Sequence, residues 1–204
     1  GRHFCLKNVK SRTNLCYPGA TINRINDNIN KMTLKSRKSR IITEIGTNDV
    51  YSFDRNVRNY ETVISNFENL TNTLKSKSDN AVVVGILPRL NESTFHLNQA
   101  KAVNSKLKII CERKGINYIN CWEEFSDQCL FAKDGIHLNN VGKSKFGTIL
   151  SENILRFLND EVKVPVATIV PPRNETVISA GCSELFVRLP PKANMLNSPA
   201  SEKS

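Results

Sequence analysis

An aspartate and a histidine three residues apart are the clearest chemical feature of this sequence. Asp134 and His137 stand in the segment Lys133-Asp134-Gly135-Ile136-His137, just before an apolar pattern of helical period. A carboxylate beside an imidazole can fix the tautomer of the ring and stabilise its cation, so that the histidine acts as a general base. The imidazole group ordinarily titrates close to neutral pH, which suits it to repeated proton transfer. We therefore predict that Asp134 orients His137 as a catalytic base.

Two loops upstream could bring further polar groups to the same place. Gly46-Thr47-Asn48-Asp49 follows the apolar run 41–45 and should lie where a buried strand ends, and Tyr17-Pro18-Gly19-Ala20 forms a second such segment. The carboxyl ends of the strands line the ligand crevice in open α/β sheets. Gly19, Asn48 and the Asp134–His137 pair are therefore expected to converge from separate loops.

The ordered series of these segments resembles the SGNH (GDSL-type) hydrolase family over roughly residues 15–158. The resemblance implies that Gly19 and Asn48 donate hydrogen bonds to the oxyanion of a tetrahedral intermediate, and that His137 with Asp134 supplies the base. Such donors are typically worth roughly 3 to 4 kcal/mol each in the transition state. The implied reaction is hydrolysis of an acyl or acetyl ester on lipid or carbohydrate, without a cofactor.

The nucleophile of that family is not found at the expected place. Family members carry a serine in a Gly-Asp-Ser turn after their first strand, upstream of the glycine segment, whereas this chain begins with Gly1-Arg2-His3. Ser11 lies in a polar stretch and follows no strand. We therefore predict an N-terminally truncated domain that lacks its first strand and its nucleophile, and that has no efficient esterase activity as this chain.

The same resemblance predicts a defect in the sheet. The family has a flavodoxin-like sheet in which strand one lies between strands two and three, so its loss would leave unpaired backbone groups on both neighbours. We expect such a chain to be less stable than an intact relative.

Each candidate residue also has a structural explanation. Gly19 after Pro18 suits a type II turn, and Asn48 with Asp49 could start the next segment as a turn or a cap. Asp134-Gly135 is a good turn, and a single histidine is often structural. A second hypothesis is therefore a non-catalytic SGNH-like module that binds nucleic acid or protein, of the kind found in open reading frames of some animal retroelements.

Apolar periodicity predicts an α/β domain with a parallel sheet. Helical spacing covers 22–32, 57–74, 97–110 and 140–158, and buried strands are expected at 40–45, 81–86 and 116–119. Strands that alternate with helices of this length indicate βαβ units, and the resemblance makes the fold three-layered and flavodoxin-like. We assign 1–159 to this domain and 160–204, which is rich in proline, to a mostly disordered tail with short extended pieces at 176–179 and 185–189.

Composition bounds the remaining function classes. The net charge of +10 lies in the first 159 residues, and much of it comes from the region 2–12 and from Lys35, Arg37, Lys38 and Arg40. A basic surface is compatible with nucleic acid, although these clusters lack interleaved aromatic residues. No run reaches the ~20 apolar residues of a membrane span. Neither the histidines nor the cysteines have the spacing of a metal site, and scattered cysteines favour an intracellular protein with idle thiols; they are Cys5, Cys16, Cys111, Cys121, Cys129 and Cys182.

Overall fold

The computed structural model describes residues 12–51, 60–162 and 175–179. Five strands form one sheet: β1 (Arg12–Cys16), β2 (Arg40–Glu44), β3 (Asn80–Val84), β4 (Asn117–Ile119) and β5 (Glu175–Ser179). Five α-helices accompany them: α1 (Ile22–Lys31), α2 (Thr47–Val50), α3 (Tyr60–Lys77), α4 (Thr94–Lys114) and α5 (Asn140–Val162). Two 3-10 turns, η1 (Glu123–Phe125) and η2 (Gln128–Leu130), lie between β4 and α5.

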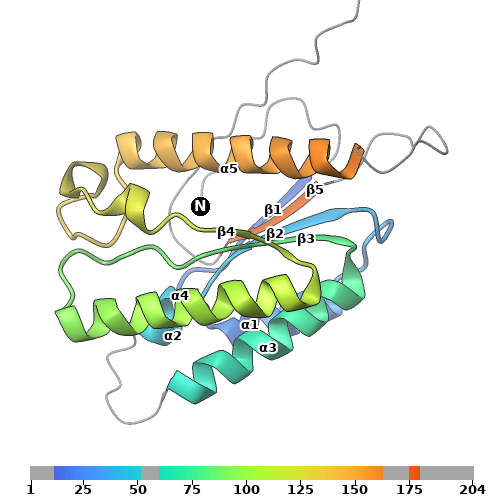
Figure 1. Ribbon diagram of the computed structural model, residues 1–204, viewed down its shortest axis with the longest axis horizontal. Helices are drawn as coiled ribbons and strands as arrows, with labels where there is room; N and C mark the ends of the chain where they lie inside the picture. Colours follow the sequence, from blue (N-terminus) through green and yellow to red (C-terminus); the bar gives the residue numbers. More distant parts are fainter. Residues whose placement is uncertain (1–11, 52–59, 163–174, 180–204) are drawn as a thin grey trace, which may run out of the picture.

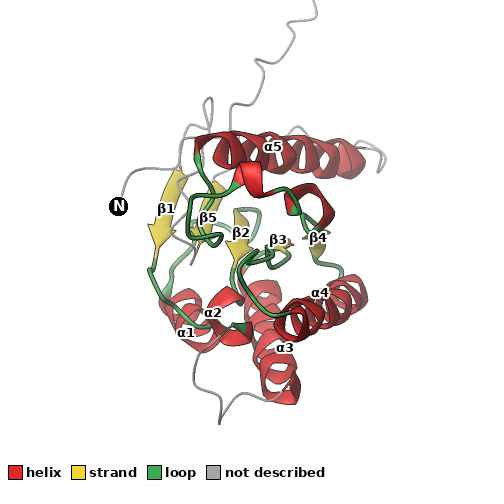
Figure 2. Ribbon diagram, turned by 90° about the vertical axis from the view of Figure 1, so that its left-hand side faces the viewer, coloured by secondary structure: helices red, strands yellow, loops and turns green. Residues whose placement is uncertain are grey.

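The sheet has the strand order β1-β5-β2-β3-β4, and every pairing is parallel. Figure 2 shows α5 on one face of the sheet and α1 to α4 on the opposite face. The predicted three-layer α/β fold with a parallel sheet is therefore confirmed. Because all strands point the same way, the loops that carry Gly19, Asn48 and Asp134 start from one edge of the sheet.

Strand residues alternate between two apolar cores. Ile41 and Val83 point to the face covered by α1, α3 and α4, whereas Ile42, Val82 and Val84 point to α5. On that second face Phe146, Leu150 and Ile154 of α5 are almost fully buried. Burial of each such side chain is worth roughly 1.5 to 3 kcal/mol, so both faces stabilise the strands that carry the loops.

Helix boundaries follow from local chemistry. Thr21 caps α1 by accepting a hydrogen bond from the backbone of Arg24, and Ser93 caps α4 in the same way. Gly115 ends α4 in the left-handed conformation with φ +61°, which glycine adopts without strain. The short helix α2 was expected only as a turn or a cap.

The predicted gap in the sheet is wrong. β5 lies between β1 and β2 and pairs with both, with Ser179 opposite Cys16 on one side and Glu44 on the other. The position between β1 and β2 that was expected to be empty is therefore filled by β5, and the backbone groups of both neighbours gain partners. The reason for expecting reduced stability is removed with the gap.

Part of the predicted tail thus belongs to the sheet. The extended piece expected at 176–179 is the strand β5, and α5 continues to Val162, beyond the predicted boundary at residue 159. The segment 185–189 and the rest of the tail lie outside the described residues, as does Ser11. The boundary at 159 does not mark the end of the sheet.

Candidate active site

Asp134 and His137 form one compact polar turn between η2 and α5. The Oδ1 atom of Asp134 accepts hydrogen bonds from the backbone N–H groups of Ile136 and His137 at 2.9 and 3.0 Å. Its Oδ2 atom lies 2.6 Å from Nδ1 of His137. The hydrogen bonds from the His137 side chain and from the two backbone groups hold the pKa of Asp134 well below its usual range. The carboxylate therefore stays ionised beside an imidazole that is about half exposed.

A glycine makes this turn fit against the rest of the protein. Gly135 has φ +65°, and a Cβ atom there would lie 2.7 Å from the amide group of Asn91. The same Asn91 side chain donates to the carbonyl of Asp134 at 2.7 Å, and the backbone N–H of Leu90 donates to the carbonyl of Gly135 at 2.8 Å. A larger residue at position 135 would be strained and would displace Asn91.

Asn139 joins the turn to the helix that follows it. Its Oδ1 atom accepts from the backbone of Val141 and Gly142, which caps α5. Its Nδ2 atom donates to the carbonyls of Cys129 and Phe131 at 2.7 and 2.9 Å. One side chain therefore fixes both the start of α5 and the beginning of the turn that carries Asp134 and His137.

The loop after β1 and the loop after β2 are hydrogen bonded to each other. Nδ2 of Asn48 donates to the carbonyl of Ala20 at 3.1 Å, and the backbone N–H of Ile22 donates to Oδ2 of the buried Asp49 at 3.0 Å. Gly19 precedes Ala20, with φ +66° and open space where a Cβ atom would point. Gly19 and Asn48, which the sequence placed in the same site, are therefore brought together.

Gly46 fixes the direction in which the second loop leaves β2. It has φ +110°, and a Cβ atom there would lie 2.6 Å from the Phe67 ring. The backbone N–H groups of Asp49 and Val50 both donate to its carbonyl, which starts α2. The turn that presents Asn48 thus depends on a position that only glycine can occupy without strain.

Arg89 orients the amide of Asn48. The guanidinium group donates to Oδ1 of Asn48 at 3.1 Å and to Oγ1 of Thr47 at 3.2 Å. It also stacks over the ring of Tyr51, with 4.9 Å from Cζ to the ring centroid, and lies 3.9 Å from Glu92. Arginine can only donate, so Oδ1 of Asn48 must face it and Nδ2 must face Ala20. Burial lowers the pKa of Arg89, while Glu92 raises it.

One loop after β3 supports both halves of the site. Asn104 of α4 holds the start of this loop, because its side chain accepts from the N–H and donates to the carbonyl of Ile86, each at 2.8 Å. Arg89 then contacts the Asn48 loop, while Leu90 and Asn91 contact the turn at Asp134. The Asn48 side and the Asp134–His137 side of the candidate site are linked through three consecutive residues.

These supporting residues were missed by the sequence analysis. Arg89 lies between the predicted strand 81–86 and the predicted helix 97–110, follows the most apolar strand, and is only 8% exposed. A charged residue so close to the end of a buried strand was the available signal, because such a side chain needs partners. Nothing in the sequence indicated which residues those partners would be.

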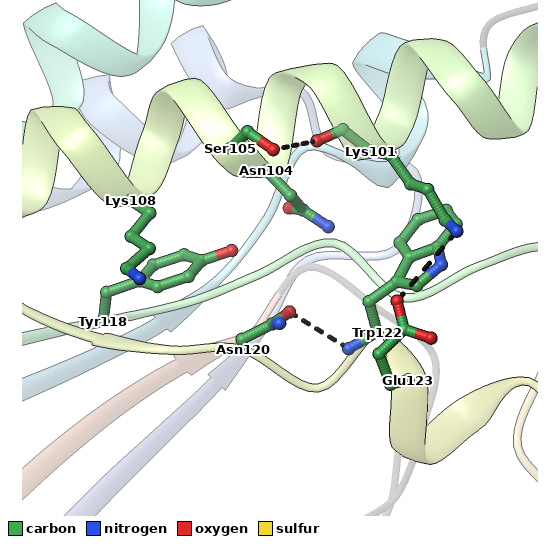
Figure 3. A pocket seen from close by; sticks show the side chains of 8 residues that line it. All are labelled: Lys101, Asn104, Ser105, Lys108, Tyr118, Asn120, Trp122 and Glu123. Carbon is green, nitrogen blue, oxygen red and sulfur yellow. Dashed lines mark hydrogen bonds and ion pairs between the residues drawn. The ribbon is translucent and has the colours of Figure 1, made fainter.

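A separate hollow of about 170 Å³ lies between α4 and the segment after β4 (Figure 3). Lys101 lies over the Trp122 ring, 5.6 Å from its centroid, and 4.0 Å from Glu123. The hydroxyl of Tyr118 is buried there without a hydrogen-bond partner in the described part of the chain. Because neither Asn48 nor His137 lines this hollow, it is distinct from the candidate site.

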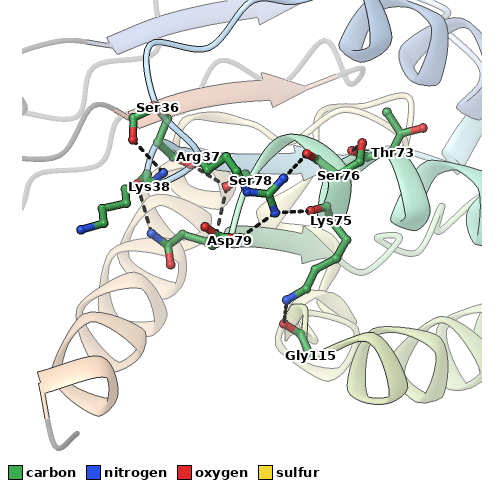
Figure 4. A network of polar contacts seen from close by, with 11 residues as sticks. Ser36, Arg37, Lys38, Thr73, Lys75, Ser76, Ser78, Asp79 and Gly115 are labelled. Carbon is green, nitrogen blue, oxygen red and sulfur yellow. Dashed lines mark hydrogen bonds and ion pairs between the residues drawn. The ribbon is translucent and has the colours of Figure 1, made fainter. Parts of the chain in front are cut away.

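The basic cluster at 35–40 leads into the start of β2 and therefore lies at the end of the sheet opposite to the candidate site. Figure 4 shows Arg37 and Lys38 of this cluster beside Lys75, Ser76 and Asp79. Arg37 donates to the carbonyls of Lys75 and Ser76 at the end of α3 and forms an ion pair with Asp79 at 2.7 Å. Arg40 is only 1% exposed. Of the four basic residues predicted for a nucleic-acid surface, Arg37 is therefore bound to the end of α3 and Arg40 is buried. Lys35 and Lys38 are exposed.

Other chemical groups give little sign of a second site. Cys111 and Cys121 are buried, and burial raises the pKa of the Cys111 thiol to about 12. Within residues 12–51, 60–162 and 175–179, no cluster of His, Cys, Asp and Glu side chains could hold a metal ion. The helices of the same ranges include none that is long and apolar enough to cross a membrane.

Comparison with known proteins gives a family and a fold. Residues 2–145 match the model of the GDSL-like lipase/acylhydrolase family. A GDSL-like lipase from Bacteroides thetaiotaomicron has a similar structure, with a TM-score of 0.56, 15% identity, and coverage of 70% of this chain and 73% of the other. An acetylxylan esterase from Geobacillus stearothermophilus gives a TM-score of 0.55 and 16% identity, over 68% and 67% of the two chains. The comparison with curated proteins gave no significant match.

Proposed function

The chain belongs to the GDSL-like lipase/acylhydrolase family, and we propose that it forms an ester hydrolase domain that uses Ser-His-Asp chemistry. The observation that carries this proposal is the 2.6 Å contact between Oδ2 of Asp134 and Nδ1 of His137. This contact favours the tautomer in which Nε2 can accept a proton from a hydroxyl nucleophile. The substrate class is an acyl or acetyl ester.

The oxyanion donors come from the two linked loops. A primary amide carries two N–H groups, and Asn48 uses one of them for the carbonyl of Ala20. The second N–H of Asn48 and the backbone N–H of Gly19 are proposed to donate to the oxyanion. Arg89 supports this role, because its hydrogen bond to Oδ1 polarises the amide and prevents it from turning over.

The nucleophile is the component that these loops do not supply. In the described part of the chain, no serine stands within three residues of the end of β1, β2, β3 or β4. The expectation that the chain is inactive for lack of a nucleophilic serine stays a prediction.

Hydrolysis of short-chain nitrophenyl esters tests the proposal. In a version of the domain that is supplied with the family's nucleophilic serine, we expect release of carboxylic acid and alcohol in equal amounts, and a loss in Asn48→Asp of roughly 100- to 1,000-fold in kcat with little change in KM. The 204-residue chain as it stands is predicted to show no efficient hydrolysis. Asp has the shape of Asn but offers no N–H at this position. In the version with the supplied serine, equal activity before and after Asn48→Asp, or no hydrolysis by either protein, would contradict the proposal.

The second candidate is a non-catalytic module that binds nucleic acid or protein. The exposed side chains of Lys35 and Lys38 and the net charge of +10 support its nucleic-acid form. Such binding should weaken steeply between about 50 and about 200 mM salt, and substitution of both lysines by glutamate should reduce it further. RNA binding that is absent or insensitive to salt would remove this candidate.

A further inference from the structure

The hollow between α4 and the segment after β4 contains a buried hydroxyl group that has no partner. Tyr118 of β4 directs its ring toward the middle of the eight side chains that line the hollow (Figure 3). Its hydroxyl oxygen is shielded from solvent and makes no hydrogen bond within the described part of the chain. Burial raises the pKa of this phenol, so the group stays protonated and has a proton to donate. A buried polar group without a partner destabilises the fold, and the hollow is the space available for such a partner.

A glycine makes room for this phenol. Gly85 follows β3, and a Cβ atom there would lie 2.4 Å from the hydroxyl oxygen of Tyr118. The backbone of Gly85 does not have the positive φ that favours glycine, so space is the reason for the missing side chain. The nearby amide of Asn104 is hydrogen bonded to both backbone groups of Ile86. The fold thus holds the phenol in place without satisfying it.

Hydrogen-bond donors outnumber acceptors around the hollow. Lys101 and Lys108 line it from one face of α4, seven positions and hence about 10 Å apart along the helix. Their ammonium groups lie 4.0 Å from Glu123 and 3.8 Å from Glu112, which is longer than the roughly 2.8 Å of a close ion pair. Glu123 alone is acidic among the eight lining residues, and its side chain is 75% exposed. The hollow therefore offers positive charge and free N–H and O–H groups to an anion.

The size of the hollow and its aromatic walls define the rest of the ligand. The hollow has a volume of about 170 Å³, and an apolar cavity of roughly 150 Å³ holds one benzene molecule. The rings of Tyr118 and Trp122 both line it. We propose that the hollow binds a small organic carboxylate with a single ring. Its carboxylate accepts hydrogen bonds from the Tyr118 hydroxyl and the two lysines, and its ring lies beside Trp122.

The single tryptophan of the chain reports directly on this binding. Trp122 is the only tryptophan among the 204 residues, and it lines the hollow. Titration of the full chain with benzoate should change the fluorescence of Trp122 saturably, with a Kd of about 1 mM or lower. Benzamide has the same shape without the charge, and inorganic phosphate has charge without a ring, so both should bind at least about 10-fold more weakly. Benzoate that does not saturate the signal by about 10 mM, or phosphate that binds as tightly, would overturn the proposal.

Three lysines of α4 separate the hollow from the general positive charge of the protein. Lys101→Gln and Lys108→Gln should each weaken benzoate binding by about 10-fold, because each removes a charged donor. Lys106→Gln is the matched control, since Lys106 is exposed on the same helix and does not line the hollow. This variant should bind benzoate as wild type does. Equal weakening in Lys106→Gln and Lys108→Gln would mean that net charge alone attracts the ligand, and would overturn the site.

Tyr118→Phe gives a reading that a merely structural tyrosine would not give. Loss of the hydroxyl should weaken benzoate binding by about 10-fold, while the Tm of the ligand-free protein should not fall and should rise by up to roughly 4 °C. The reason is that the buried hydroxyl has no partner to lose in the described part of the chain. Unchanged affinity, or a lower Tm without ligand, would overturn the role of Tyr118. None of these measurements requires ester hydrolysis, so they remain decisive if the proposed hydrolase function fails.

Discussion

The two ends of the sheet use arginine in opposite ways. At the carboxyl end, Arg89 is buried and donates to the side chains of Thr47 and Asn48. At the amino end, Arg37 has a side chain that is 56% exposed and donates to backbone carbonyls at the end of α3 and to Asp79. The first arginine sets the orientation of a group that could act on substrate, and the second satisfies a helix terminus. Loss of the Arg89 contacts should therefore change the orientation of Asn48, whereas loss of the Arg37 contacts should affect only the end of α3.

This contrast has a physical basis in burial. A guanidinium group removed from water must have partners whose geometry is fixed, so Arg89 constrains every group around it. Arg37 can exchange its contacts for water at small cost. We therefore expect changes at the carboxyl end to affect catalysis, and changes at the amino end to affect stability alone.

The largest expected effect at the carboxyl end is the removal of the base. His137→Ala should lower kcat for ester hydrolysis by roughly 100- to 10,000-fold, because general acid–base catalysis contributes about that much. The matched control is His96→Ala on α4, since His96 pairs with Glu92 and is the other histidine of the described residues. Steady-state kinetics on the same ester measures both. If the two variants lose activity equally, His137 has no special role and the contrast between the ends disappears.

The two arginines test the comparison directly. Arg89→Ala frees the amide of Asn48 and should reduce kcat by up to roughly 100-fold, because a displacement of about 1 Å in a catalytic group has an effect of this size. Arg37→Ala should leave kcat unchanged and lower the free energy of unfolding by at most about 1 kcal/mol.

Arg89→Lys distinguishes positioning from bulk stability. Lysine keeps the charge but cannot hold Thr47 and Asn48 together in a fixed fork, so stability should recover more than kcat does. Denaturant unfolding and kinetics on the three variants provide the readings. Full recovery of kcat in Arg89→Lys would show that charge alone matters.

The fold was more predictable from the sequence than the site. Apolar spacing depends on local burial, and it therefore predicted the strands at 40–45 and 81–86 and the helices after them. β5 was predicted only as a short extended piece, because its place between β1 and β2 depends on contacts with residues more than 130 positions away. Arg89 was missed for the same reason, since its partners Thr47 and Asn48 are 42 and 41 residues distant.

Two asparagines that contact backbone carbonyls extend the comparison to stability. Asn139→Ala removes the cap of α5 and two further hydrogen bonds, and should lower the free energy of unfolding by about 2 to 3 kcal/mol. Asn80→Ala at the amino end removes one exposed hydrogen bond to the carbonyl of Lys38 and should cost less than about 1 kcal/mol. Denaturant unfolding of both variants checks the ranking, and equal losses would mean that the turn at Asp134 is not held through Asn139.

The smallest expected effect is on the stability of the folded protein at low pH, and it involves one aspartate at each end of the sheet. Hydrogen bonds from His137 and from two backbone groups lower the pKa of Asp134, and a hydrogen bond from Arg37 lowers that of Asp79. A carboxyl group with a lowered pKa in the folded state stabilises the protein above its unfolded pKa of about 3.9, and this stabilisation is lost as pH falls through the folded value. Asp134→Asn and Asp79→Asn should therefore each flatten the fall in stability below about pH 4.

Hydrolysis should separate these two variants even though stability does not. Asp134→Asn removes the negative charge that orients the His137 ring, so kcat should fall across the neutral pH range. Asp79→Asn should keep the wild-type pH profile of kcat. Thermal unfolding between about pH 2 and about pH 7 together with the pH profile of kcat measures both properties. A shift in the pH profile of kcat in Asp79→Asn would show that the amino end of the sheet also affects catalysis. The proposed contrast between the two ends of the sheet would then be wrong.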